Sequence, residues 1–328
     1  MGFRIDIGNI DLRNIRSAFN WEAYWASRYP SGLVLTVNSD TQITLDWTNN
    51  GDTDYDGVSI ERSTDGVTYA EIDTAVTGSV QYIDAGLTEN YYWYRIRYYR
   101  GTYYSAYSNV AYNEAPLVVY DGNTAAWYKY DDLTTVTKDG ANRVSVWADR
   151  LGSGHNLLQG GGANQPTWSM ADGVLFDGAT DYMQTLPFVY NQPQFIYFVG
   201  RQVTWSNLDY IFDGINDDFM SLSQKIGIPN LIANAGAVLN NVNLAVNTFG
   251  IIRLLYNGAV STFQINETAS VNGNLGAANA GGFTLSRRGV SIGRYSNIEV
   301  KEIILRNVAD GAGVQAQIYN YLKDANGL

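Results

Sequence analysis

The strongest constraint on the fold is a series of short segments in which apolar and polar side chains alternate. Ile43, Leu45 and Trp47 repeat with a period of two, and similar runs follow along most of the chain. Successive side chains of a β-strand point to opposite faces, so this spacing gathers the apolar ones on one face of a sheet. Residues 49–51 (Asn-Asn-Gly) and 65–66 (Asp-Gly) favour tight turns between the runs. The pattern predicts an all-β protein.

Composition supports a folded chain and restricts its partners. The 328 residues are long enough for two or three domains, and Gly 33, Tyr 25 and Trp 8 suit short strands and tight turns. A net charge of −11 repels phosphate backbones, so no nucleic-acid partner is expected. No apolar run of transmembrane length is present, so no membrane insertion is expected.

The first residues and the cysteine count bear on where the chain is made. Residues 1–19 mix charges into every few positions and lack an apolar stretch, so they are not expected to be a secretory signal. The chain has no cysteine, which is compatible with synthesis in a bacterial cytoplasm. A protein that has domains of an extracellular type but neither an export signal nor disulfides is expected to leave the cell by lysis, as a virion protein does.

The chain is predicted to have three parts. Residues 1–30 form a leader, residues 31–115 a first domain and residues 117–328 a second domain. The strand pattern stops at residues 113–116 (Asn-Glu-Ala-Pro), where proline disfavours its continuation, so this segment is the predicted linker.

The first domain contains a set of motifs in a fixed order: Pro30…Leu33, 43–47 (ITLDW), 60–66 (IERSTDG), Tyr82-x-Asp84…Leu87, Tyr92-x-Tyr94-Arg95 and Ser105…Ser108-Asn109. With these motifs the domain resembles a fibronectin type III domain over residues 31–112. The resemblance implies an immunoglobulin-like sandwich, with Trp47 as its core tryptophan and Tyr92 as its tyrosine-corner residue, preceded by Leu87.

The second domain shows many short strands separated by Gly, Asn and Asp. Strands are predicted at 195–199, 251–255, 260–265, 283–285, 291–293 and 302–305. The C-terminus differs: Asp310 is predicted to cap a helix that ends near Gly327. The apolar face of that helix is predicted to be Val314, Ile318, Tyr321 and Leu322.

This second domain resembles the concanavalin A-like (laminin-G-like) jelly rolls of phage and bacterial surface proteins. The resemblance is carried by Trp127…Asp131-Asp132-Leu133, 144–156, 165–168 (QPTW), 175–182 and 303–305 with the terminal helix. The predicted fold class is therefore an all-β chain, a fibronectin III sandwich plus a concanavalin A-like jelly-roll sandwich, with a short C-terminal helix.

No catalytic constellation is predicted. His155 is the one histidine and lies in a glycine-rich turn, so a histidine-based triad is not expected. Jelly-roll glycosidases need two facing carboxylates, and the candidates are Glu299-x-x-Glu302 and Asp217-Asp218. Both pairs are interpreted as solvated surface charges rather than as an active site, and the chain is expected not to be an enzyme.

Calcium stays open as a cofactor. Carboxylates on turn-like segments suit its oxygen coordination, and the site candidates are Asp177 and Asp181. Further oxygen ligands on turns are Asp149, Asp213, Asp217 and Asp218. The alternative is an Asp-Gly turn, in which the side chain accepts backbone hydrogen bonds.

Two groups of aromatic residues are candidate contact surfaces. Tyr98, Tyr99, Tyr103, Tyr104 and Tyr107 lie on two predicted hairpin strands, so some must point outward, where they suit sugars or protein partners. Cross-strand pairing is the simpler interpretation. The leader holds Phe19, Trp21, Tyr24 and Trp25. These residues either pack on the first domain or anchor the chain in a larger assembly, and the anchor is the prediction, because a fibronectin-type domain does not need such a leader.

Together these features predict a non-enzymatic phage virion structural protein: a capsid decoration protein, a head fibre or a tail-associated adhesin. The leader would bind other virion proteins, and the lectin-like jelly roll would bind host-surface glycans or proteins from many copies on the virion. This prediction rests on fold resemblance. The alternatives are a bacterial surface adhesin or accessory carbohydrate-binding part of a polysaccharide-active system, and a jelly-roll glycoside hydrolase.

Overall fold

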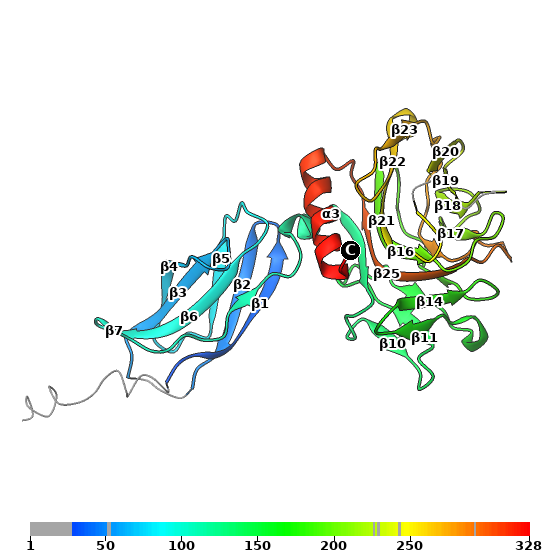
Figure 1. The fold of residues 1–328 in the computed structure, drawn as a ribbon. Coiled ribbons are helices and arrows are strands. Elements are labelled where there is room, and N and C mark those ends of the chain that lie inside the picture. The colour runs from blue at the N-terminus through cyan, green and yellow to red at the C-terminus, as the bar shows by residue number, and fades with distance from the viewer. Residues whose placement is uncertain (1–27, 51–53, 226, 228–229, 242–243, 292) are drawn as a thin grey trace, which may run out of the picture. The chain divides into compact units, whose positions relative to one another are not determined.

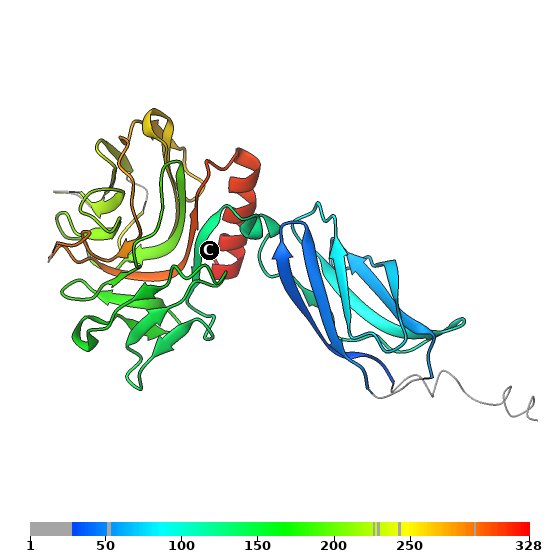
Figure 2. The same cartoon turned by 180° about the vertical axis from the view of Figure 1, so that it is seen from behind.

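The computed structural model describes residues 28–50, 54–225, 227, 230–241, 244–291 and 293–328 (Figure 1). The chain divides into two compact units, Met1–Leu117 and Val118–Leu328. Within the described residues, the regular structure consists of strands, three short 3₁₀ turns and one α-helix (Figure 2). The predicted all-β fold class is confirmed.

The first unit is a sandwich of two antiparallel sheets. Its strands are β1 (Ser31–Ser39), β2 (Gln42–Thr48), β3 (Gly57–Ser63), β4 (Ala70–Val76), β5 (Gln81–Ala85), β6 (Trp93–Arg100), β7 (Tyr103–Tyr104) and β8 (Ala111–Tyr112). One sheet has the order β1-β2-β5, and the other has the order β4-β3-β6-β7, with β8 also paired to β6. This is the immunoglobulin-like fibronectin type III arrangement that the sequence predicts.

The predicted landmarks of this sandwich take their expected places. Trp47 and Leu87 are buried in the core between the two sheets. The Tyr92 hydroxyl accepts hydrogen bonds from the backbone N–H groups of Thr88 and Glu89 at 2.9 and 2.8 Å. These bonds fix the loop before β6 to the strand that follows it, which confirms Tyr92 as the corner residue.

The segment after β7 is joined to β6 by two serine hydroxyl groups. Ser105 N–H donates to the carbonyl of Tyr98, and the Ser105 hydroxyl accepts from the N–H of Tyr98. Ser108 makes the same pair of bonds with Ile96. The hydroxyl groups satisfy strand N–H groups that a regular ladder would otherwise pair, and they hold residues 105–108 along the strand.

The second unit is a larger sandwich whose short strands follow the turn signals of the sequence. Its elements are η1 (Leu117–Tyr120), β9 (Thr124–Lys129), β10 (Val136–Lys138), β11 (Val144–Trp147), β12 (Leu157–Leu158), η2 (Gly162–Asn164), β13 (Thr167–Ser169), β14 (Gly173–Asp177), β15 (Met183–Gln184), β16 (Gln194–Gln202), β17 (Tyr210–Asp213), β18 (Ser221–Gln224), β19 (Leu231–Asn234), β20 (Val238–Asn241), β21 (Gly250–Tyr256), η3 (Gly258–Val260), β22 (Ser261–Ile265), β23 (Val271–Gly273), β24 (Thr284–Leu285), β25 (Asn297–Arg306) and α3 (Ala312–Asn326).

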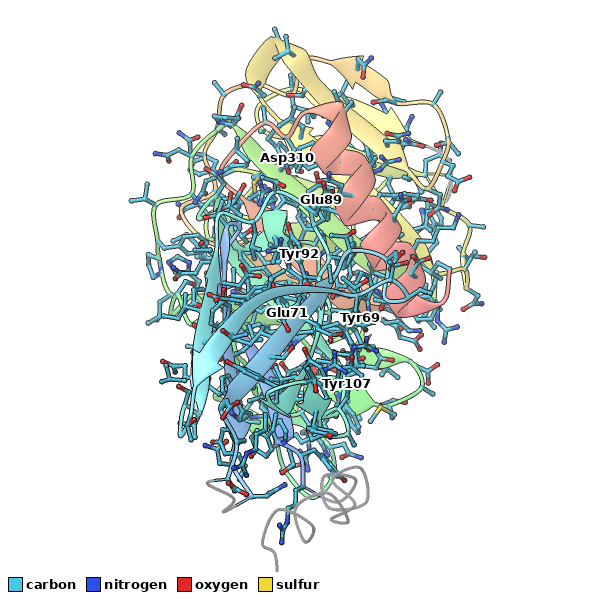
Figure 3. All side chains as sticks on the ribbon, turned by 90° about the vertical axis from the view of Figure 1, so that its left-hand side faces the viewer. Tyr69, Glu71, Glu89, Tyr92, Tyr107 and Asp310 are labelled. Carbon is cyan, nitrogen blue, oxygen red and sulfur yellow. The ribbon has the colours of Figure 1, made fainter. Side chains whose placement is uncertain are left out.

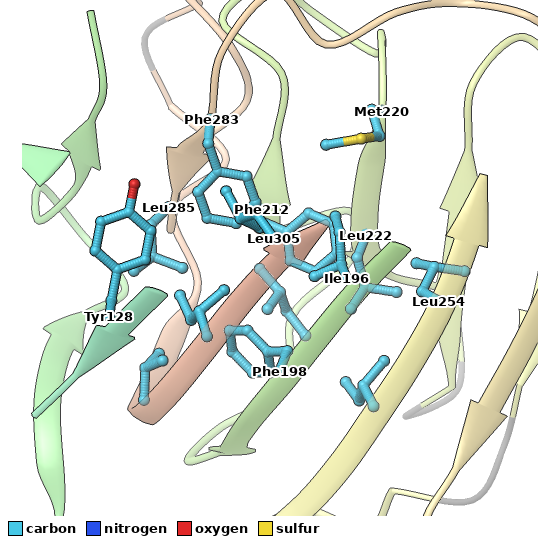
Figure 4. Packing of buried hydrophobic residues seen from close by; sticks show 14 of the residues in the cluster. Tyr128, Ile196, Phe198, Phe212, Met220, Leu222, Leu254, Phe283, Leu285 and Leu305 are labelled. Atoms are coloured by element: carbon cyan, nitrogen blue, oxygen red, sulfur yellow. The ribbon is translucent and has the colours of Figure 1, made fainter. Parts of the chain in front are cut away.

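Two antiparallel sheets enclose the core of this unit. One has the order β13-β14-β25-β16-β21-β22-β23, with β9 also paired to β25, and the other has the order β10-β11-β12-β15-β24-β17-β18-β19-β20. Apolar side chains from both inner faces meet between the sheets, among them Phe198, Leu254, Leu305, Phe212 and Leu285 (Figure 4). This is the jelly-roll sandwich that the sequence predicts.

Helix α3 covers the outer face of the sheet that contains β16 and β25. The Tyr321 ring packs edge-on against Trp127 of β9 with ring centroids 6.0 Å apart, and the Arg253 guanidinium lies 4.3 Å from the Tyr319 ring centroid. The helix buries Ile318, Tyr319, Tyr321 and Leu322, so the predicted face is right except that Val314 is only partly buried. The helix ends at Gly327, which adopts the left-handed conformation (φ 66°).

The prediction that Asp310 caps this helix is wrong. The N-cap is Gly311, and no side chain bonds to the first turn. The Asp310 carboxylate instead accepts hydrogen bonds from Arg306 Nε (3.0 Å) and the Tyr197 hydroxyl (2.9 Å). The buried Arg306 guanidinium requires a carboxylate partner, so the Asp310 carboxylate pairs with it and does not cap the helix.

The strand predicted at 291–293 is also wrong where it can be examined. Ser291 lies in a bend and Gly293 outside any strand, while Ile292 lies outside the described residues. Gly293 has φ of +95°, which is incompatible with a strand, and the Ser291 N–H donates to Asp217 at 3.1 Å. A loop contact outweighs the local strand propensity.

Candidate functional site

The outer face of the β4-β3-β6-β7 sheet carries the most distinctive side-chain arrangement of the first unit. Along β6, Tyr94, Ile96 and Tyr98 point into the core, and Arg95 and Arg97 therefore point outward. Two guanidinium groups thus stand two residues apart on one exposed sheet face.

Glu61 of β3 holds both arginines. It is paired with Arg95 across the two strands, and one of its oxygens accepts a hydrogen bond from Arg95 Nε at 2.8 Å and forms an ion pair with Arg95 Nη2 at 2.7 Å. Its other oxygen forms an ion pair with Arg97 Nη2 at 2.9 Å and accepts a hydrogen bond from the Tyr107 hydroxyl at 2.8 Å. The Glu61 side chain is only 6% exposed, so a nearly buried carboxylate is compensated by two guanidinium groups and one hydroxyl donor.

Tyrosine rings stack on the two guanidinium groups. The Arg95 Cζ atom lies 4.2 Å from the centroid of Tyr69 and 3.8 Å from that of Tyr107. The Arg97 Cζ atom lies 3.8 Å from the centroid of Tyr104 and 4.6 Å from that of Tyr107. Tyr69 and Tyr107, which both contact Arg95, are labelled in Figure 3. Such cation–π contacts fix the planes of the rings and of the arginines. We call Glu61, Tyr69, Arg95, Arg97, Tyr104 and Tyr107 together the Tyr–Arg face.

The hydroxyl groups of Tyr69 and Tyr107 stay protonated near neutral pH. Burial, the bond to Glu61 and the negative charge of Glu61 raise the pKa of Tyr107, and burial raises the pKa of Tyr69. Arg97 Nε is buried and has no hydrogen-bond partner among the described residues. The face therefore presents aromatic rings with polar hydrogen-bonding groups between them.

Exposed aromatic rings lie at both ends of the β6 row. Tyr104, which is 44% exposed, pairs with Tyr99 at one end. At the other end Tyr112, which is 59% exposed, stacks on Trp93 with ring centroids 6.3 Å apart. From Trp93 to Tyr99 the strand extends about 20 Å, given a rise of ~3.3 Å per residue. The arrangement is a rigid, elongated contact surface.

The sequence predicts the tyrosines of this region but not the site as a whole. Tyr98 is a core residue stacked on Tyr55, whereas Tyr99, Tyr104 and Tyr107 lie on the outer face. Tyr103 is exposed and precedes Tyr104 on the two-residue strand β7. Sequence reasoning missed Glu61, Tyr69, Arg95 and Arg97. The alternation of residues 92–98 could have marked both arginines as outward-facing.

The calcium candidates Asp177 and Asp181 form a turn. One Asp177 oxygen accepts from the N–H groups of Ala179, Thr180 and Asp181 at 2.8–2.9 Å, and Asp181 accepts from the Asp177 N–H at 3.2 Å. Burial acts to raise the pKa of Asp177, but the backbone donors outweigh it and lower that pKa. Burial and the Asp177 charge raise the pKa of Asp181 to about 6.

Asp213, at the end of β17, organises the loop that follows. Its oxygens accept from the N–H groups of Gly214 and Asp218, both at 2.8 Å, and of Gly289 at 3.2 Å. Burial raises its pKa to about 7, and the charge of Asp218 adds to this effect. The Asp217 carboxylate accepts from the Val290 N–H at 3.0 Å. These aspartates therefore connect the loop at 214–220 to the loop at 287–291.

The carboxylates considered for glycosidic chemistry have structural partners. Asp218 pairs with Arg288, and Glu299 pairs with Arg201. Glu302 is fully buried and accepts from Trp127 Nε1 at 2.8 Å, the Tyr321 hydroxyl at 2.7 Å and Asn326 Nδ2 at 2.9 Å. The interpretation of Glu302 as a solvated surface charge is wrong, because its side chain bonds the terminal helix to β9.

Other candidates are placed as follows. The Asp149 carboxylate accepts from the N–H groups of Trp127 and Ser153, both at 2.7 Å. His155 Nδ1 lies 2.8 Å from the Ala125 carbonyl, and its ring stacks on Phe188 at 3.9 Å. The predicted anchor residues Phe19, Trp21, Tyr24 and Trp25 lie outside the described residues.

The described residues show neither a metal-binding cluster nor a membrane-spanning helix. No group of three or more His, Cys, Asp or Glu side chains in this part of the chain is placed to hold a metal ion. No helix there combines the length and apolar character needed to cross a membrane.

Comparisons with known proteins yield similar folds. No protein-family model matches the chain, and no curated protein matches it. A solved Fn3-like protein from Clostridium thermocellum is 25% identical over 26% of this chain and 88% of its own, with a TM-score of 0.23. Titin domains A168–A170 are 18% identical over 26% of this chain and 30% of theirs, with a TM-score of 0.23.

A Trypanosoma rangeli sialidase in complex with sialic acid aligns more widely. It is 10% identical over 90% of this chain and 53% of its own, with a TM-score of 0.47, so this chain spans about half of that protein.

Proposed function

We propose that this chain is a non-enzymatic structural and binding protein of a phage virion: a capsid decoration protein, a head fibre or a tail-associated adhesin. The Tyr–Arg face is the observation that carries the proposal. It holds rigid rings and paired charges on an exposed sheet, and tyrosine and arginine are enriched where proteins bind partners.

The non-enzymatic part of the proposal is supported by the roles of the acidic side chains. A glycosidase of the jelly-roll type needs two carboxylates that face a substrate. Glu299 and Asp218 are each engaged with an arginine, and Glu302 is buried beneath the terminal helix. These contacts favour a structural use over a catalytic one.

Attachment and copy number complete the proposal. Residues 1–30 would bind other virion proteins through their aromatic residues, and the two sandwiches would be carried outside the particle after lysis. Many copies on one particle would convert weak single contacts with host-surface glycans or proteins into strong attachment.

The test is electron microscopy of the purified particle together with peptide mass fingerprinting of the same preparation. We expect the chain in stoichiometric, symmetric copies. A chain that is absent from every particle and behaves as a free monomer would contradict the virion role. Incubation of the purified chain with polysaccharides should release no reducing sugar, and release would contradict the non-enzymatic role.

A further inference from the structure

The Tyr–Arg face is balanced in charge although the chain is strongly acidic. Arg95 and Arg97 form ion pairs with Glu61, and Glu71, which is paired with Glu61 across β3 and β4, also lies on this face, where it accepts the Ser59 hydroxyl at 2.5 Å. The chain as a whole has a net charge of −11. A polyanion would meet no net positive charge on the face and a negative field around it.

We propose that the Tyr–Arg face binds an uncharged oligosaccharide, and this inference rests on the proposed role of the chain as a binding protein. The charge balance of the face disfavours acidic polymers, whereas the negative field around the face does not weaken the binding of a neutral sugar. The aromatic rings, the polar groups and the length of the row favour chains of neutral hexoses.

Aromatic rings suit the apolar side of a pyranose. Tyr104 exposes 44% of its surface, and its ring is held by the Arg97 guanidinium at 3.8 Å, so it is ordered before a ligand arrives. Polar groups of the same face, including the Tyr69 and Tyr107 hydroxyls, can exchange hydrogen bonds with sugar hydroxyls.

The length of the row indicates a chain of sugars. Trp93 with Tyr112 and Tyr99 with Tyr104 form aromatic ends about 20 Å apart along β6. A single sugar would reach one end, and an oligosaccharide would reach both. Affinity is therefore expected to increase with oligosaccharide length.

The experiment measures binding of the full chain to neutral gluco-, galacto- and manno-oligosaccharides of increasing length, with sialylated and uronic-acid oligosaccharides beside them. Three variants are compared: Tyr104→Ala, Tyr104→Phe and Tyr103→Ala. Tyr103 and Tyr104 are neighbours of similar exposure on β7, and alternation places them on opposite faces of the hairpin. Tyr103→Ala is thus a matched control.

We expect a neutral series to bind, Tyr104→Ala to weaken binding about tenfold, and the other two variants to stay within about twofold of the parent. Binding of acidic oligosaccharides only would overturn the proposal. Loss with Tyr103→Ala alone would also overturn it and would place the ligand in the open pocket lined by Asp56, Arg100 and Tyr103. Absence of binding by every oligosaccharide tested would overturn it as well. The chain could then still occur in particles, so failure of this inference can be distinguished from failure of the proposed virion role.

Discussion

Glu61 and Arg95 occupy paired positions of β3 and β6, and one carboxylate oxygen accepts a hydrogen bond from Arg95 Nε at 2.8 Å and forms an ion pair with Arg95 Nη2 at 2.7 Å. The same carboxylate also receives Arg97 and Tyr107 through its other oxygen. One nearly buried acid therefore orders most of the Tyr–Arg face.

Glu61→Gln is expected to lower the free energy of unfolding of the first unit by about 1–2 kcal/mol. The amide offers a weaker acceptor and turns an NH₂ group toward a guanidinium, and partial exposure of both arginines limits the loss. Urea denaturation measures the change. The control is Glu89→Gln at an exposed position, which should change stability by less than about 0.5 kcal/mol. Equal effects of the two variants would contradict the role of Glu61.

Tyr92→Phe is expected to destabilise the first unit by about 1–2 kcal/mol, because the N–H groups of Thr88 and Glu89 lose their acceptor. Thermal unfolding provides the measurement. Tyr112→Phe removes a hydroxyl from a residue that is 59% exposed and should have little effect. A Tyr92→Phe protein as stable as the parent would show that the loop before β6 is held by other contacts.

Asp213 predicts a pH dependence of the second unit. Its pKa is about 7 in the fold and 3.8 in its ordinary state, so the folded protein binds the proton more tightly than the unfolded chain. The contribution of Asp213 to the free energy of unfolding is therefore most favourable below about pH 4 and is lost as the pH rises to about 7. The difference in this contribution between the two pH limits is up to ~4 kcal/mol. Calorimetry of the parent and Asp213→Asn between pH 4 and pH 8 tests this. The stability difference, parent minus variant, should fall with rising pH, and a constant difference would refute the assignment.

Tyr321→Phe is expected to loosen helix α3, because the buried Glu302 carboxylate loses one of three donors. A loss of about 1–3 kcal/mol is expected for a buried charge left short of a partner. Hydrogen exchange of the α3 amides is the readout. Tyr319→Phe on the same helix keeps its ring against Arg253 and serves as the control. Faster exchange in the Tyr319 variant than in the Tyr321 variant would contradict the role of Glu302.

Calcium removal is expected to leave the melting temperature unchanged. The shared oxygen of Asp177 already accepts three backbone N–H groups, which a bound cation would displace. Thermal scans in EDTA and in millimolar calcium chloride compare the two conditions. A rise in calcium that Asp181→Asn abolishes would instead support the calcium site predicted from the sequence.

Local patterns were sufficient for the strands and for several core residues. The continuous apolar run at 195–199 forms the centre of β16, and Trp47 is buried as the period-two pattern requires. Gly327 ends the terminal helix because only a residue tolerant of positive φ suits that position. In these cases interactions between residues that are close in the sequence are sufficient to determine the local structure.

Contacts between distant residues decided the rest. Arg95 is stabilised by Glu61, which lies 34 residues earlier in the sequence. Both residues contact a segment that Ser105 and Ser108 fix to β6. Asp310 could cap a helix by its position in the sequence, but the buried Arg306 takes its carboxylate. The sequence pattern by itself determined the all-β class, many of the strands and the turns, since these depend on periodicity and backbone preference, and the resemblance of its motifs to known families indicated the two sandwiches. Only the tertiary structure decided which charges pair, because a buried charge is stable only beside partners that the fold brings to it.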